Sequence, residues 1–227
     1  MKPTKFFTTL LILSGIVLLS SCLGPRKVNK WVQQHYATVN NMATKKSEDY
    51  ISINTQLSSG DNSLSKTEKK IANILPLIVY WQYDYLNTCT LNPQLPINNF
   101  TETVLSYAHT KRLKQKLNGR KIEFTINKMP GAFSINDRGH IVWLIYIFSW
   151  DKIIFKAVTR EMEVSYRVME GDVEVKKGMV AVTGLKEEKF LGLFQSLRKR
   201  TKQFLAEYDA EVKVMSKKAL DKIMSEL

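Results

Sequence analysis

The alternation of apolar and polar residues divides this chain into three parts. The first is an apolar segment from Phe6 to Leu19, which follows Lys2 and Lys5. Its length fits the apolar core of a secretory leader and is short of the roughly 20 residues that span a bilayer. The second part reaches to about residue 70 and is rich in Ser, Thr, Asn and Lys, which predicts a polar tether. Periodic apolar positions begin near Ile71, where we expect the folded domain to start.

Strand patterns dominate the third part. Residues 122–126 and 158–168 alternate between apolar and polar side chains, as half-buried strands do. Residues 74–81 and 141–150 are almost wholly apolar, which is typical of strands buried on both faces. Gly178 lies where the parity of the apolar positions changes, which predicts a bulge.

Helical spacing predicts a helix over 99–118 and another from about Leu185 to the C-terminus. The order of elements predicts an α+β fold: a mainly antiparallel sheet of four to six strands, two helices on one face, and a long C-terminal helix. A straight helix over 192–227 would be about 54 Å long, so we expect a break near Tyr208 or a protruding end. The predicted division is a leader over 1–21, a lipidated cysteine and tether over 22–70, and a single domain over 71–227.

The leader ends in Leu19-Ser20-Ser21-Cys22, which resembles the lipobox of bacterial lipoproteins. The resemblance implies cleavage between Ser21 and Cys22, acylation of Cys22, and a membrane anchor. Several acyl chains on one residue would hold the protein durably. Leu23 is not the acidic residue that this resemblance requires for inner-membrane retention, so we expect the outer membrane, on its periplasmic face. An ordinary secretory leader with a chance cysteine is the alternative.

The formal net charge is +13 at pH 7. Nucleic acid is a poor partner for an exported, lipid-anchored chain. An anionic membrane surface, lipopolysaccharide or an acidic protein fits the charge better. Arg198, Lys199, Arg200 and Lys202 form the densest basic cluster, for which two interpretations stay open: contact with an anionic surface, or a solvated helix face.

No catalytic signature accompanies these features. Cys89 is interpreted as a buried structural thiol, with a reactive thiol as the alternative. The three histidines are far apart in sequence, and no metal, phosphate or nucleophile motif occurs. Glu161 and Glu163 are expected on the solvent side of a strand. We therefore expect no catalytic residue, no metal and no cofactor.

The element order from Ile71 to Leu227 resembles the auxiliary lipoproteins of ABC-type transport systems and the lipopolysaccharide-assembly lipoprotein. Residues 75–93 also resemble uncharacterised lipoproteins of Bacteroidetes-type bacteria. The second resemblance implies a compartment and no activity. The leading hypothesis is a non-enzymatic scaffold or adaptor in envelope transport or assembly, with an envelope protein as partner. The second hypothesis is a lipid or glycolipid carrier whose aromatic series, Tyr80 to Tyr85, lines a groove. The third is an unfamiliar hydrolase that uses Cys89.

Overall fold

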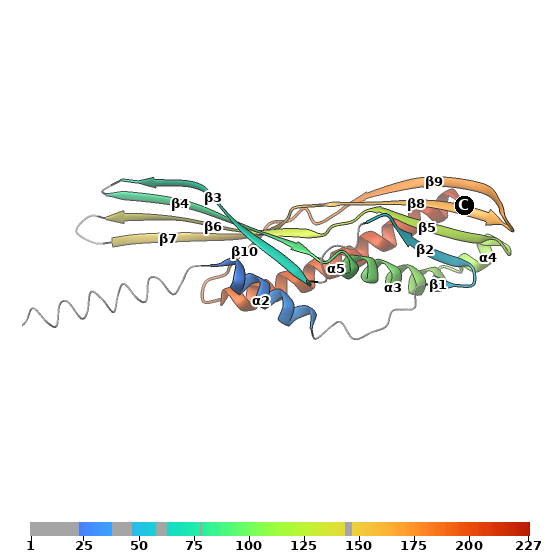
Figure 1. Ribbon diagram of the computed structural model, residues 1–227, viewed down its shortest axis with the longest axis horizontal. Coiled ribbons are helices and arrows are strands. Elements are labelled where there is room, and N and C mark those ends of the chain that lie inside the picture. The colour runs from blue at the N-terminus through green and yellow to red at the C-terminus, as the bar shows by residue number, and fades with distance from the viewer. Residues whose placement is uncertain (1–22, 38–46, 58–62, 78, 144–146) are drawn as a thin grey trace, which may run out of the picture.

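The protein consists of two five-stranded sheets that lie end to end, with helices along one side (Figure 1). The computed structural model describes residues 23–37, 47–57, 63–77, 79–143 and 147–227. One sheet has the order β1-β2-β5-β8-β9, and the other has the order β10-β7-β6-β4-β3. The α+β class is confirmed, although the strands form two sheets where a single sheet was expected.

The first sheet contains β1 (Ser47–Glu48), β2 (Ile51–Thr55), β5 (Lys121–Lys128), β8 (Glu161–Glu170) and β9 (Val173–Thr183). The second contains β3 (Ser65–Pro76), β4 (Tyr80–Leu91), β6 (Ala132–Trp143), β7 (Ile147–Ala157) and β10 (Lys189–Phe190). The helices are α2 (Pro25–Tyr36), α3 (Gln94–Thr110), α4 (Leu113–Leu117) and α5 (Leu197–Glu226).

Two short links carry the chain from one sheet to the other. Residues 129–131 join β5 to β6, and residues 158–160 join β7 to β8. The backbone N–H of Gly131 donates to Thr159 Oγ1 at 2.9 Å, which ties one link to the other. The two sheets therefore form one long ribbon that bends at these links.

Helix α5 packs along this ribbon without a break. It has 30 residues, which makes it about 45 Å long. Its first turn is capped by Ser196 Oγ, which accepts from Lys199 N at 3.3 Å. Tyr208, where a break was expected, is 2% exposed and faces the core. The break is absent because the buried positions recur every three or four residues along the whole helix.

The expected tether over 22–70 is largely folded. Helix α2 buries Val28, Val32 and Tyr36 in the same core as α5, and Tyr36 Oη donates to Asp209 Oδ1 at 3.2 Å. Strand β2 pairs in parallel with β5. The domain thus includes residues well before Ile71. Cys22 and the leader lie outside the described residues.

The two apolar runs are hairpins and not buried strands. Residues 74–81 contain the end of β3 and the start of β4, and residues 141–150 contain the end of β6 and the start of β7. The bulge predicted at Gly178 of β9 is not there. The pairing of β8 with β9 shifts register between Val168 and Met169 of β8 instead. Gly178 has another role, since the Tyr166 ring lies where its side chain would be.

Phe204 joins α5 to the second sheet. Its ring centroid lies 5.4 Å from that of Phe133 and 5.5 Å from that of Phe155. We expect Phe204→Ala to lower the free energy of unfolding by about 3–5 kcal/mol, because it leaves a cavity in the core. Urea denaturation followed by circular dichroism measures this.

Phe194→Ala is the matched control, because the Phe194 side chain is fully exposed. Its effect should stay within about 0.5 kcal/mol. Equal losses for the two variants would contradict the packing of α5 against the second sheet.

Candidate functional site

The second sheet projects beyond the helices as an arm (Figure 1). The arm comprises residues 70–76 of β3, 80–86 of β4, 137–143 of β6 and 147–153 of β7, with the tip residues Leu77 and Val79. Strands of 12 residues are about 40 Å long, and the ten residues of β8 add about 33 Å. Helix α5 spans only about 45 Å of this ribbon. Among the described residues, no helix therefore lies against the distal part of the sheet.

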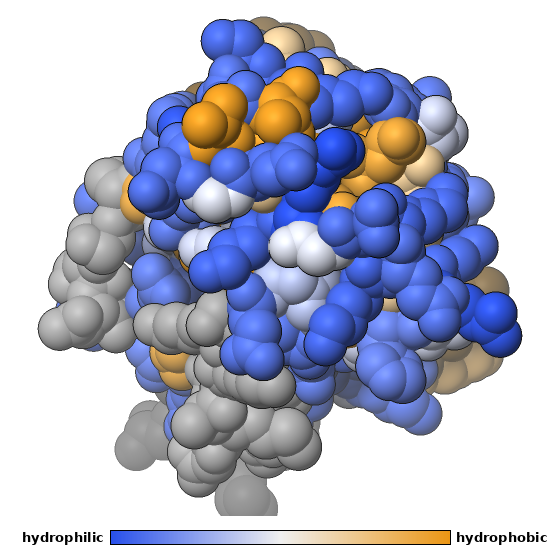
Figure 2. All heavy atoms as spheres, turned by 90° about the vertical axis from the view of Figure 1, so that its right-hand side faces the viewer, coloured by the Kyte–Doolittle hydropathy of each residue, from blue (hydrophilic) through white to orange (hydrophobic). Residues whose placement is uncertain are grey.

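Large apolar side chains are exposed on the arm. Their exposed fractions run from 46% to 61%, and they are Ile71, Ile74, Leu75, Leu77, Val79, Trp81, Trp143 and Trp150. Three of the four tryptophans of the chain are among them. Figure 2 shows the opposite end of the molecule, which is mostly hydrophilic with a few separate apolar side chains. The arm thus carries eight of the 17 large apolar residues that are exposed in the described part of the chain, and such a cluster is typical of an interaction site.

Both faces of the arm carry these residues. Trp81 pairs with Ile141 and lies on the face that continues, nearer the helices, into the buried Cys89 and Phe133. Trp150 pairs with His140 and lies on the other face. A partner that covered one face only would leave the other in water.

Polar contacts stiffen the arm. On the face with Trp150, Tyr80 Oη and His140 Nδ1 are hydrogen-bonded, and the His140 ring stacks on Trp150 with centroids 5.1 Å apart. On the face with Trp81, Tyr83 Oη donates to Asp151 Oδ1 at 2.7 Å, and its ring covers Gly139. A side chain at position 139 would collide with that ring. The arm is therefore a defined structure rather than a loose pair of hairpins.

An open edge runs along β7. Leu191 N donates to Ile153 O at 3.0 Å beside the short strand β10, so the backbone groups of Ile153 point away from β6. Because backbone direction repeats every two residues, the groups of Asp151 and Ser149 point the same way. No strand in the described part of the chain pairs with β7 there. The edge is thus free to accept another strand.

The four residues of the predicted basic cluster do not all lie on the same side of α5. Arg198 and Lys199 are exposed and Lys202 is half-buried, whereas Arg200 is 8% exposed. Arg200 Nη1 lies 3.1 Å from Glu207 Oε1, and its guanidinium lies over the Phe155 ring. Arg200 therefore does not belong to the exposed basic face. Its position four residues before Phe204 is the sequence signal for this inward orientation.

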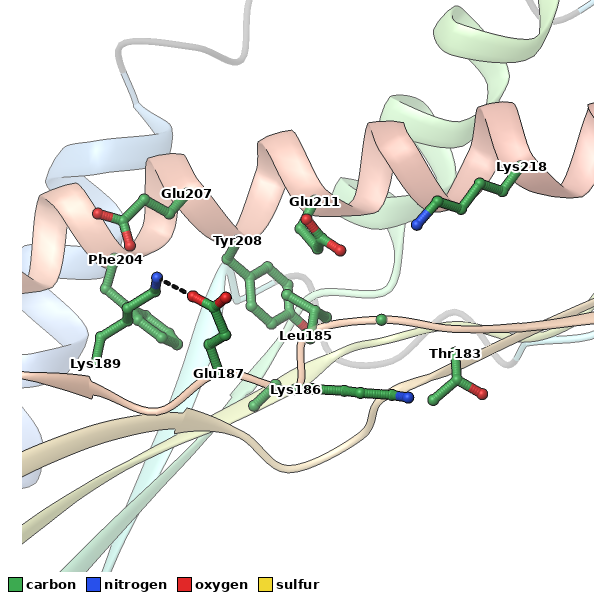
Figure 3. A pocket seen from close by; sticks show the side chains of 12 residues that line it. Thr183, Leu185, Lys186, Glu187, Lys189, Phe204, Glu207, Tyr208, Glu211 and Lys218 are labelled. Carbon is green, nitrogen blue, oxygen red and sulfur yellow. Dashed lines mark hydrogen bonds and ion pairs between the residues drawn. The ribbon is translucent and has the colours of Figure 1, made fainter.

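A cavity of about 410 Å³ lies between α5 and the segment before β10 (Figure 3). Its apolar floor is made by Leu185, Phe204 and Tyr208, and its remaining wall is largely charged, with Lys186, Glu187, Lys189, Glu207, Glu211 and Lys218. Among the described residues, no Ser, Cys or His lines it. The charged wall does not suit an acyl chain.

The other candidate groups of the sequence lie apart from one another. Cys89 is 1% exposed, and burial raises its pKa to about 11, which keeps the thiol protonated and unreactive. Glu161 pairs with Lys128 at 2.5 Å on the surface, and Glu163 accepts from Asn127. Within the described ranges, no three His, Cys, Asp or Glu side chains gather as metal ligands, and no helix has the length and apolarity to cross a membrane.

Comparison with known proteins adds no relative: no family model, no curated protein and no solved structure matches the chain. The candidate site is therefore defined by its own geometry. Sequence reasoning missed the arm, although Pro76 between two strongly strand-forming segments is a signal for a turn.

Asp137 makes the stability of the arm depend on pH. Burial raises its pKa from 3.8 to about 6, with a further increase from Asp151 and an opposing effect of Lys69. At pH values between these two pKa values, the folded protein therefore binds more protons than the unfolded chain. The free energy of unfolding consequently falls as pH rises through this range. We expect Asp137→Asn to raise the free energy of unfolding near pH ~7 by about 1 kcal/mol, after allowance for partial exposure.

At about pH 2.5, which is below both pKa values, the carboxyl is protonated in both states, and the same variant should have little effect. Urea denaturation at the two pH values measures the difference. An equal gain at both would show that the substitution acts through packing and not through ionisation.

Proposed function

We propose that this protein is a non-enzymatic scaffold or adaptor of the bacterial cell envelope, anchored by lipid on Cys22, with the arm as its docking element. The observation that carries the proposal is the arm itself. It is ordered by its own contacts, carries exposed apolar residues on both faces and is not covered by any other part of the described chain. Clusters of exposed large apolar residues mark interaction sites, whereas single exposed apolar residues need no explanation.

We infer that the partner of the arm is a protein that adds a strand to β7. In hydrocarbon, the unpaired backbone groups of an open edge would each cost several kcal/mol, whereas a partner strand satisfies them. The edge of β3 is guarded by Lys66, Lys69 and Pro76, which disfavour strand addition. On the outer side of β7, by contrast, β10 already pairs in an antiparallel manner, and the edge continues past it.

The partner class we propose is an envelope transport or assembly protein. The location we propose is the periplasmic face of the outer membrane, which rests on the leader and on Leu23. A lipid or glycolipid carrier is the second candidate. It is favoured less, because Tyr80 to Tyr85 belong to an open sheet rather than to a groove, and the cavity beside α5 has a charged wall. The burial of Cys89 counts against a hydrolase that uses its thiol.

Ser149→Pro tests the strand-addition proposal. Ser149 is exposed, and its N–H points away from β6, so proline removes a donor at the open edge without removing one from the β6–β7 ladder. The natively lipidated protein is extracted in gentle detergent and its associated proteins and lipids are identified by mass spectrometry. We expect one envelope protein at near-stoichiometric yield with the unaltered chain, and a loss of about tenfold or more with Ser149→Pro.

Ser149→Thr is the matched control, because it keeps the N–H and favours a strand. It should retain the partner. Extraction of the unaltered protein as a monomer alone would contradict the adaptor proposal. Co-purified lipid without protein would support the carrier instead.

A further inference from the structure

A tight turn just before α5 presents two large apolar side chains to solvent. Leu193 is 92% exposed and Phe194 fully exposed. The turn is fixed at both ends, since Gln195 N donates to Gly192 O at 3.1 Å and Gly192 N donates to Gln195 Oε1 at 3.1 Å. Phe194 has φ +62°, a left-handed conformation that glycine adopts more readily. An exposed aromatic residue in a strained backbone position indicates a role outside the fold.

Cations lie beside this turn on two helices, and we call them the basic face: Arg26, Lys30, Arg198, Lys199 and Lys202. Arg198 Nη2 donates to Gln34 Oε1 at 3.0 Å, so the first turn of α5 touches α2. Because residues four apart share a face of a helix, Arg26 and Lys30 continue the line from Gln34. Helix α2 contains no acidic residue.

Three carboxylates on α5 and on the segment before β10 are engaged by other groups. Glu207 pairs with Arg200, Glu187 pairs with Lys189 at 2.5 Å, and Asp209 lies 3.6 Å from His35. Because these carboxylates do not neutralise it, the basic face keeps a positive field toward solvent. An anionic surface complements this field.

The described chain begins beside this face. Leu23 is buried, and α2 starts at Pro25. An extended chain spans at most about 3.6 Å per residue, so an acyl group on Cys22 would be within roughly 15 Å of Arg26. A bilayer that held such an anchor would lie close to the basic face and to the turn.

We propose that residues 192–195 and the basic face form a second membrane contact, in which Leu193 and Phe194 enter the headgroup region of an anionic bilayer. The occupant is the bilayer surface, since two apolar side chains on a convex turn, bordered by cations, are typical of interfacial anchors. Which membrane face this contact meets depends on the proposed anchor at Cys22. The contact itself requires neither the anchor nor the arm.

The test is flotation of the mature-length chain with Cys22→Ser, which carries no acyl group, with vesicles of phosphatidylcholine alone or with about one third phosphatidylglycerol. We expect binding to the anionic vesicles and little to the neutral ones. Leu193→Ser with Phe194→Ser should reduce the partition coefficient about tenfold or more. Arg198→Gln with Lys202→Gln should reduce it about fivefold for each charge.

Val173→Ser with Val175→Ser is the matched control, because these exposed residues lie on the β8–β9 hairpin at the opposite end of the molecule. It should bind like the unaltered chain. Absence of binding by the unaltered chain, or full binding by the turn variant, would overturn the proposal. Loss of vesicle binding with Trp81→Ser and Trp143→Ser, while the turn variant binds, would also overturn it and assign the bilayer to the arm. Because no acyl group or partner protein takes part, these outcomes are independent of the adaptor proposal.

Discussion

The packing of α5 against both sheets is the interaction on which the rest of the structure depends. Toward its C-terminal end the helix is held to the first sheet, where Tyr166 Oη donates to Glu226 Oε2 at 2.5 Å and Lys222 Nζ to Ala181 O at 2.9 Å. Near its start, Phe204 packs on the aromatic rings of the second sheet. One helix thus holds a bent ribbon in a fixed shape. Because the helix is shorter than the ribbon, part of the second sheet is left bare, and that part is the arm.

This arrangement separates two kinds of surface. The arm projects beyond the N-terminal end of α5 with apolar faces and an open edge, whereas the turn before α5 combines apolar side chains with cations. The arm extends for about 23 Å along seven residues of each strand. An open edge suits a protein strand, and a basic turn suits a charged bilayer. The same helix positions both surfaces, and the adaptor we propose uses each of them.

The sequence predicted the elements whose burial is one-sided. Strands β5 and β8 alternate strictly, Gly171 at φ +59° lies in the turn after β8, and α5 has an uninterrupted apolar stripe. The arm could not be predicted in the same way. An apolar run such as 141–150 is typical of a strand buried on both faces, and hydrophobicity alone does not tell what covers it. The polar composition of 23–70 likewise indicated a tether, and it concealed that the apolar residues of α2 face the core.

The candidate site was accessible to sequence reasoning only in fragments. The sequence located the basic cluster. That Arg200 faces inward follows only from its position on the helix relative to Phe204. That Leu193 and Phe194 are exposed follows only from the structure. The open edge of β7 depends on strand order, which pattern does not encode.

The central claim is that a partner protein covers the arm. The most direct measurement is photo-crosslinking in living cells, with a photoreactive residue at Ser149 and, separately, at Val173 on the opposite end of the molecule. A discrete adduct with a different envelope protein from position 149, and none from 173, is the predicted result. No protein adduct from position 149, or the same adducts from both positions, would contradict it.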